Sequence, residues 1–305
     1  KEIHFPHSLG LLYSAFTYYT GFKVNSGEYK LMGLAPYGEP RYYQKIKDNL
    51  IDIKKDGSFK LDQSYFDYAT GLRMTNSKFN SLFGQKQRDS KSERLTQFHM
   101  DIAASIQKLT EEIMIKMAKS LREEYQIKNL CMAGGVALNC VANGKILDEK
   151  IFENIWVQPA AGDAGGSIGA ALLVWHEYLA NPKKTNKDSD TMQGSLLGGS
   201  FSNYDIALRL DRIGAVYKKI NESAIYDEIA KKIYENNVIG WFSGRMEFGP
   251  RALGNRSILG NPLSPDMQTK MNLKIKYRES FRPFAPAIKL DKVNDWFEFD
   301  GASPY

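Results

Sequence analysis

The side chains best suited to binding an anion lie in one stretch of the sequence, residues 240–289. It holds nine Lys and Arg residues against three Asp and Glu, and thereby carries the whole formal net charge of +6. Arg245, Arg251 and Arg256 fall there in a segment rich in Gly and Pro, together with Asn255. Guanidinium groups bind phosphate and carboxylate oxygens bidentately, and a rigid loop reduces the cost of aiming them. The pattern favours a pocket for an anionic ligand over a solvated basic surface.

A second group of cations follows between Lys274 and Pro286. It includes Lys276 and Arg282, and Pro283 and Pro286 favour an extended backbone around them. Several cations converging on one ligand would suit a dianion such as a phosphoryl group. Aromatic residues interleaved with these cations leave an RNA-binding module as an alternative, because bases stack on such rings.

Two glycine-rich turns each follow a short apolar run and precede a stretch that is compatible with a helix. Gly134 and Gly135 form the first turn, and the second runs from Ala160 to Gly166 and includes Gly162, Asp163 and Gly165. Glycine lets a backbone approach a phosphate, and the N–H groups that open a helix can bind it. Tight strand-to-helix packing explains either turn alone equally well, but two at one sheet edge favour a nucleotide. Asp163 is then either a metal ligand beside the phosphates or the N-cap of its helix.

An acid and a base, Glu28 and Lys30, stand beside a segment that reads as a loop, residues 31–40. The acid can bind ribose hydroxyls and the lysine a phosphate, although adjacent opposite charges are also common on surfaces. None of the four histidines has the spacing of a metal motif. His7 is a site residue or a hydrogen-bonded structural one, and His176 is expected to be structural.

The apolar pattern predicts the elements that must position these residues. A long amphipathic helix is expected over 101–125, because its apolar residues recur three or four positions apart. Strands over 129–133 and 154–158 each lead into a glycine turn, which predicts an α/β layer with both turns at one sheet edge. The other expected elements are a strand over 238–242 and helices over 8–19, 136–147, 167–179, 224–236 and 265–275.

The chain has 305 residues, of which 43% are hydrophobic and 25% charged, so it is expected to be globular with two domains. The polar segment 183–195 predicts a linker between domains 1–182 and 196–305. The longest apolar stretch, Ala164 to Trp175, is shorter than the roughly 18–20 residues of a membrane span. With only two cysteines, a reducing, cytoplasmic location is expected. The two ends predict an interior piece of a longer protein.

Several segments, in one order, resemble the NodU/CmcH-type O-carbamoyltransferases over most of the chain. They are residues 6–16, 28–38, 133–139, 162–166, 249–257 and 282–286. The resemblance implies an actin-like ATPase-fold domain lacking its N-terminal part, followed by a YrdC-like α/β domain lacking its C-terminal part. The second would make a carbamoyl-adenylate from carbamoyl phosphate and ATP with Mg, and the first would pass the carbamoyl group to a hydroxyl of a small molecule, such as a natural product or sugar.

The resemblance also implies roles for individual residues. Three catalytic cations would hold the donor: Arg251, Lys276 and Arg282. Three further residues would support them: Arg245, Asn255 and Arg256. Asp163 would ligate a divalent metal, by the family's pattern iron, whose histidine ligands lie outside this chain. The nucleotide would be lined by Glu28, Lys30, Gly134, Gly135, Asn139, Gly162 and Gly165.

Three other functions share parts of this pattern. A tRNA threonylcarbamoyladenosine-type enzyme shares both domain types, a sugar-kinase-type phosphotransferase shares the actin-like domain, and an RNA-binding module shares the basic segment. The uninterrupted motif from Gly249 to Arg256 favours a small-molecule acceptor, so nucleic acid is not expected as a partner. A membrane is not expected either, because the longest apolar stretch is too short to span one. The 305 residues alone are expected to be inactive, because the metal site and the adenylation pocket would be incomplete.

Overall fold

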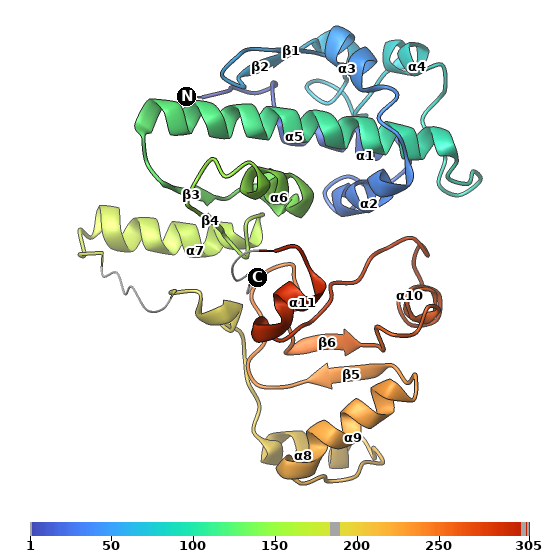
Figure 1. The fold of residues 1–305 in the computed structure, drawn as a ribbon, viewed down its shortest axis with the longest axis vertical. Helices are drawn as coiled ribbons and strands as arrows, with labels where there is room; N and C mark the ends of the chain where they lie inside the picture. Colours follow the sequence, from blue (N-terminus) through green and yellow to red (C-terminus); the bar gives the residue numbers. More distant parts are fainter. Residues whose placement is uncertain (1, 184–189, 300–302, 304) are drawn as a thin grey trace. The chain divides into compact units, whose positions relative to one another are not determined.

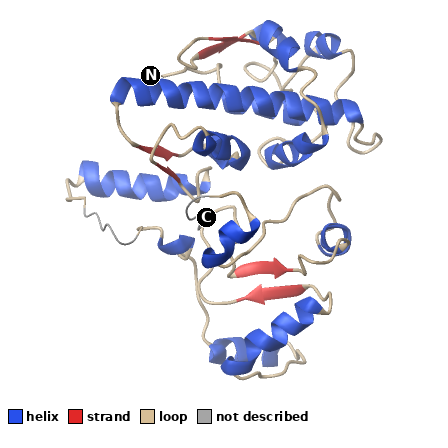
Figure 2. Cartoon of the chain, in the orientation of Figure 1, coloured by secondary structure: helices blue, strands red, loops and turns tan. Residues whose placement is uncertain are grey.

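The computed structural model describes residues 2–183, 190–299, 303 and 305. The chain forms two compact units, Lys1–Gly162 and Asp163–Tyr305. Figure 1 labels their elements, and Figure 2 separates helices from strands. The division of the chain at a linker over 183–195 stays a prediction. Residues 184–189 of that segment lie outside the described residues, and Gln193–Ser195 form a short 3-10 turn, η5.

The first unit is mostly helical and holds two small sheets. Its α-helices are α1 (Leu9–Tyr19), α2 (Glu28–Leu34), α3 (Tyr43–Asn49), α4 (Ser77–Phe83), α5 (Gln97–Tyr125) and α6 (Cys140–Asp148). Its 3-10 turns are η1 (Ala35–Tyr37), η2 (Gln63–Tyr65) and η3 (Gly135–Leu138). Its strands are β1 (Ile51–Ile53) and β2 (Phe59–Leu61), paired antiparallel, and β3 (Asn129–Met132) and β4 (Asn154–Val157), paired in parallel.

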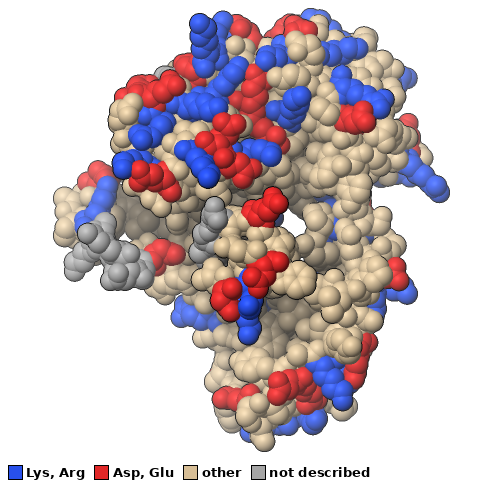
Figure 3. Space-filling model, in the orientation of Figure 1, with Lys and Arg blue, Asp and Glu red and all other residues tan. Residues whose placement is uncertain are grey.

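The long helix α5 is the scaffold of the first unit. Ile102, Ile106, Leu109 and Ile113 are fully buried along one face, which confirms the predicted apolar stripe as far as Ile113. Leu121, also expected in the stripe, is exposed. The helix starts at a capping box formed by Thr96 and the residue three positions on. Helices α1, α2, α3 and α6 all contact α5. On the face that carries α5, Lys and Arg are interspersed with Asp and Glu (Figure 3).

An ionic cluster fastens α3 to α5. Glu112 Oε1 accepts hydrogen bonds from Lys47 Nζ at 2.8 Å and from Lys116 Nζ at 2.7 Å, and the hydroxyl of Tyr43 donates to Oε2. Burial by itself would raise the pKa of Glu112, but these three donors lower it to about 2. The carboxylate is therefore ionised at neutral pH and holds the two helices together.

The strands predicted beside the two glycine turns pair as expected. Asn129 is opposite Asn154 and Met132 is opposite Val157 in a parallel ladder. The carboxyl ends of parallel strands lie at the same sheet edge, so the chain that leaves β3 and the chain that leaves β4 start side by side. The predicted α/β arrangement is present at this point of the chain.

Two local predictions are wrong. The helix expected over 136–147 is divided at Asn139 into η3 and α6, because the Asn139 side chain caps a new helix instead of continuing the old one. The loop expected over 31–40 begins as helix α2 and continues as η1. Leu31 and Leu34 are fully buried on one face of that helix, and this packing overrides the loop signal of the neighbouring Gly and Pro residues.

The second unit also mixes helices with a small sheet. Its helices are α7 (Ala164–Leu173), α8 (Asn203–Arg212), α9 (Glu222–Tyr234), α10 (Met267–Lys270) and α11 (Val293–Trp296). Single π-helical turns, η4 (Val174–Tyr178) and η6 (Met271–Ile275), extend α7 and α10, and a 3-10 turn, η7 (Leu290–Lys292), precedes α11. Strands β5 (Ile239–Phe242) and β6 (Arg256–Leu259) pair antiparallel. The mixture of helices and small sheets is compatible with the predicted α/β class. In the described part of the chain, every helix lacks the length or the apolar character of a bilayer span.

Candidate functional site

The first glycine turn has a backbone that only glycine adopts without strain. Gly134 has φ +94° and ψ 162°, and its N–H donates to the carbonyl of Ala161 at 2.8 Å, so the two predicted turns are joined by a hydrogen bond. Gly135 follows as the first residue of η3. A Cβ added to either glycine would meet nothing within 4 Å. The backbone of this turn is therefore open to a ligand, as the prediction of a phosphate cradle requires.

Gly134→Ala is expected to lower the free energy of unfolding by about 1–3 kcal/mol, because the cost of the forced backbone conformation is not relieved by any new contact. Gly135→Ala is the matched control, since its φ is not positive and its surroundings are equally open. Chemical denaturation of both variants beside the wild type measures the difference. Equal losses in both variants would contradict the assignment of strain to Gly134.

Asn139 lies at the centre of a buried polar network that sequence reasoning found only in part. Asn139 and Gln107 exchange two amide hydrogen bonds, at 3.0 and 3.1 Å, and Tyr13 donates its hydroxyl to Gln107 Oε1 at 3.0 Å. Asn139 Oδ1 also accepts from the N–H of Ala142 at 3.1 Å, which caps α6. Burial raises the pKa of Tyr13 above its ordinary value. The network joins α1 and α5 to the end of the glycine turn.

The signal for the missed partner was present in the sequence. Gln107 stands directly after Ile106 on the predicted amphipathic helix, close to its apolar stripe, and a polar residue there needs a hydrogen-bond partner. The sequence does not name that partner, since Gln107 and Asn139 are 32 positions apart.

Glu28, predicted to bind ribose, holds the start of α2 in this structure. Its carboxylate accepts from the Ser14 hydroxyl at 2.7 Å, from the N–H of Asn25 at 2.9 Å and from the N–H of Gly27 at 3.1 Å. Lys30 places its Nζ 5.9 Å from the ring centroid of Phe22. Glu28 is thus bonded to α1 through Ser14, and the contact of either residue with a nucleotide stays a prediction.

The second glycine turn leads into the second unit at Asp163. Gly162 ends the first unit, and Gly165 lies in the first turn of α7. Asp163 occupies the N-cap position of α7, but its side chain makes no capping hydrogen bond and is exposed. The structural alternative, a side-chain cap, is therefore not realised.

One carboxylate can supply one oxygen ligand to a hard cation, and a metal site needs more. Among residues 2–183 and 190–299, no three His, Cys, Asp or Glu side chains cluster so that they could hold a metal. His7 Nδ1 accepts from the N–H of Leu61 at 3.1 Å, and His176 Nδ1 lies 3.0 Å from the carbonyl oxygen of Asn181, as expected of structural histidines. Asp163 thus fits a metal as a single ligand only.

The predicted supporting residues Arg245 and Asn255 lie in the loop between β5 and β6, and Arg256 is the first residue of β6. The side chains of all three donate to backbone carbonyls. The Arg256 guanidinium donates to the carbonyls of Ser243 at 2.8 Å and Gly244 at 3.1 Å, and lies 3.4 Å from the ring centroid of Phe242. Arg245 Nε donates to the carbonyl of Leu196 at 2.9 Å. These guanidinium groups shape the loop, and their direct contact with the donor stays a prediction.

Arg251, the first of the predicted catalytic cations, is an exposed residue of that loop, and Lys276 is exposed after η6. Arg282 differs from both, because it is 5% exposed and its Nη1 lies 3.2 Å from Glu279 Oε2. The buried amide of Asn272 donates to the carbonyl of Arg282 at 2.8 Å and fixes this segment. The predicted cations therefore lie in two separate segments of the chain, residues 245–256 and 276–282.

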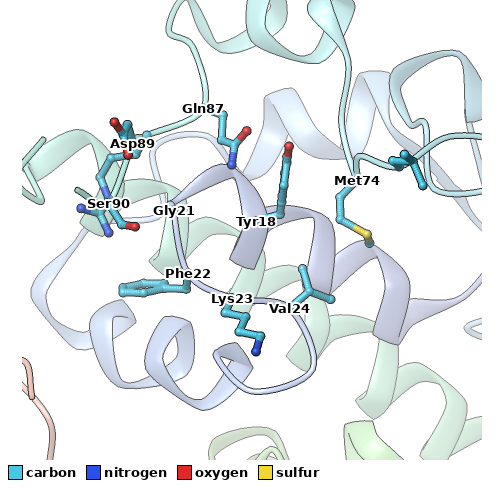
Figure 4. A pocket seen from close by; sticks show the side chains of 11 residues that line it. Tyr18, Gly21, Phe22, Lys23, Val24, Met74, Gln87, Asp89 and Ser90 are labelled. Atoms are coloured by element: carbon cyan, nitrogen blue, oxygen red, sulfur yellow. The ribbon is translucent and has the colours of Figure 1, made fainter. Parts of the chain in front are cut away.

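A surface pocket of about 670 Å³ lies in the first unit at the C-terminal end of α1. Tyr18, Phe22, Lys23 and Gln87 are among its lining residues (Figure 4). The glycine turn lies toward the other end of α1, because η3 packs beside Gly10. The helix has 11 residues, so about 16 Å separates its ends. This pocket and the predicted nucleotide turn are different features of the unit.

Two family models match the chain in the order of its two units. The model described as "Carbamoyltransferase N-terminus" matches residues 1–172, which include the glycine turns and Asp163. The model described as "Carbamoyltransferase C-terminus" matches residues 230–305, which include Arg251, Lys276 and Arg282. The chain belongs to the carbamoyltransferase family.

Named relatives support the same membership. Nodulation protein NolO of Bradyrhizobium diazoefficiens is 36% identical over 97% of this chain and 51% of its own length. Nodulation protein NolNO of Sinorhizobium fredii is 36% identical over 96% of this chain and 41% of its own length. A protein of Synechocystis sp. named "Uncharacterized protein sll1178" is 61% identical over the whole chain and 49% of its own length. The chain spans about half the length of these curated relatives.

Proposed function

We propose that the full-length protein is an ATP-dependent O-carbamoyltransferase. It converts carbamoyl phosphate and ATP into a carbamoyl-adenylate and transfers the carbamoyl group to a hydroxyl of a small-molecule acceptor. The observation that carries the proposal is the pair of carbamoyltransferase matches, at residues 1–172 and 230–305. The proposal includes an actin-like fold for residues 1–182 and a YrdC-like fold for residues 196–305.

The proposed reaction balances in two stages. Water cleaves carbamoyl phosphate to carbamate and phosphate, and a carbamate oxygen then attacks the α-phosphorus of ATP, which releases pyrophosphate and leaves carbamoyl-AMP. In the second stage the acceptor hydroxyl attacks the carbamoyl carbon, AMP leaves, and the hydroxyl proton passes to a base. Both stages act on phosphate-bearing anions, whose charge must be stabilised as bonds change.

The cations of the second unit suit the first stage. In this proposal the donor is held by Arg251, Lys276 and Arg282. The β5–β6 loop holds Arg251 in position within the second unit. Nine basic residues against three acidic ones between 240 and 289 favour an anionic ligand in this part of the unit.

The first unit suits a nucleotide in this proposal. The open backbone at Gly134 would approach a phosphate of ATP, with Mg as its counterion. Asp163, the first residue of the second unit, would give one oxygen to a divalent metal, iron by the resemblance, whose histidine ligands would lie outside this chain. Bound there, such a metal would polarise an oxygen of the reactants.

The proposal is tested on the full-length protein with carbamoyl phosphate and ATP. Carbamoyl-AMP is expected by mass spectrometry, together with one phosphate and one pyrophosphate, and no product is expected when either substrate is omitted. Phosphate transfer from ATP without carbamoyl phosphate would favour the sugar-kinase alternative. RNA binding that weakens steeply with salt and ignores carbamoyl phosphate would favour the binding module.

A further inference from the structure

The loop between β5 and β6 has a first part that ends at Glu247 and a second part that begins at Leu253, and the side chain of Glu247 joins the two. The first part is fixed to the segment before α8, where the N–H of Met246 donates to the carbonyl of Gly199 at 3.0 Å. The second part returns to β6. Arg251 lies between the two parts, so its position depends on how they are joined.

A single carboxylate oxygen joins the two parts. Glu247 Oε1 accepts hydrogen bonds from the N–H groups of Leu253 at 2.8 Å, Asn255 at 2.7 Å and Arg256 at 3.2 Å. Glu247 is 7% exposed, so these bonds form where water competes little. Burial by itself would raise the pKa of Glu247, but the backbone donors outweigh it and the net shift is downward. The side chain is therefore an ionised acceptor inside the loop.

Two glycines shape the backbone of the loop around Arg251. Gly249 and Gly254, on either side of Arg251, have φ values of +122° and +111°, which other residues rarely adopt. The N–H groups of Leu253, Asn255 and Arg256 converge on one point and form a nest of the kind that binds anions. Glu247 fills the nest with the protein's own anion. A phosphate donor is therefore left to the side chains of the loop, among them Arg251.

We propose that Glu247 is a positioning residue, which closes the β5–β6 loop so that Arg251 is held in place for an anionic, phosphate-bearing donor. This inference rests on the proposed function for the identity of the donor, carbamoyl phosphate. The structural part, closure of the loop by the carboxylate, stands on the three hydrogen bonds alone.

Two variants of the full-length protein separate positioning from general stability. Glu247→Ala removes the acceptor, and Glu247→Gln keeps an amide oxygen but removes the charge. Asp205→Asn is the matched control, because Asp205 also accepts a backbone N–H, from Ser202 at 3.2 Å, where it caps α8. The control loses an exposed carboxylate that accepts one backbone N–H in another part of the same unit.

Hydrogen exchange and donor binding are measured on these variants. The amides of Leu253, Asn255 and Arg256 are expected to exchange about tenfold faster or more in Glu247→Ala than in the wild type or Asp205→Asn. The dissociation constant and the KM for carbamoyl phosphate are expected to rise about tenfold or more in Glu247→Ala and less in Glu247→Gln, and to stay within about twofold in Asp205→Asn.

The outcomes are distinguishable. If Glu247→Ala does not fold, the Glu247→Gln values decide. Unchanged exchange at the three amides, or donor binding in the folded Glu247 variants equal to that of the wild type, would overturn this inference. A wild-type protein that binds no carbamoyl phosphate would overturn the proposed function and the named donor, while the exchange data would still decide whether Glu247 closes the loop.

Discussion

Replacing Arg251 or Lys276 with alanine is expected to slow carbamoyl-AMP formation by about 10²–10³-fold, the usual cost of removing one charge-stabilising donor from an active site. The physical reason is that the donor and ATP both carry negative charge, and their reaction needs cations fixed beforehand rather than drawn from solvent. Mass-spectrometric measurement of initial rates in the full-length protein gives the effect directly.

Arg212→Ala serves as the control for this pair. Arg212 lies at the C-terminal end of α8 and is exposed, so its removal changes the net charge of the unit by the same amount. Its rate is expected to stay within about twofold of the wild type, because an exposed charge outside the site contributes little. Carbamoyl-AMP formed at the wild-type rate by both Arg251→Ala and Lys276→Ala would remove these residues from the site.

The elements with strong periodicity were predictable from sequence. The stripe on α5 and the paired strands β3 and β4 follow from apolar spacing and from repeated strand-turn patterns, which are local properties. The division of the helix at Asn139 was not predictable in this way. Asn139 caps α6 and also has a buried partner 32 positions away on α5, a contact that the local pattern does not contain.

For the site residues too, local sequence properties were predictable and contacts between distant residues were not. Residue type alone identifies a cluster of guanidinium groups as suited to anions, because a guanidinium group stays protonated in a protein. The folded structure decides which guanidinium groups bond to the protein's own backbone. Arg245 and Arg256 both donate to backbone carbonyls. The carboxylate of Glu247 escaped prediction for a related reason. It is one of three acids in the basic segment, and its role depends on three N–H groups that face it only after folding.

The pair formed by Asn139 and Gln107 allows a sharp test of the buried network. Asn139→Ala is expected to lower the free energy of unfolding by about 2–4 kcal/mol, because it removes the cap of α6 and leaves the buried Gln107 amide without that partner. Gln107→Ala is expected to cost a similar amount, since it takes away the hydrogen-bond partner of the Tyr13 hydroxyl and of the Asn139 amide nitrogen.

The double variant is expected to lose about 1–3 kcal/mol less than the sum of the single losses, because the second substitution removes the group that the first left unpaired. Thr110→Ala combined with Asn139→Ala is the control. Thr110 is also buried on α5, but its hydroxyl donates to the carbonyl of Ile106 and shares no partner with Asn139. That combination should be additive to within about 0.5 kcal/mol. Denaturant unfolding of the wild type and of the single and double variants gives all the free energies of unfolding that this comparison needs. If the stability losses of Asn139→Ala and Gln107→Ala were also additive, the two hydrogen bonds between these side chains would not be what holds the end of the glycine turn.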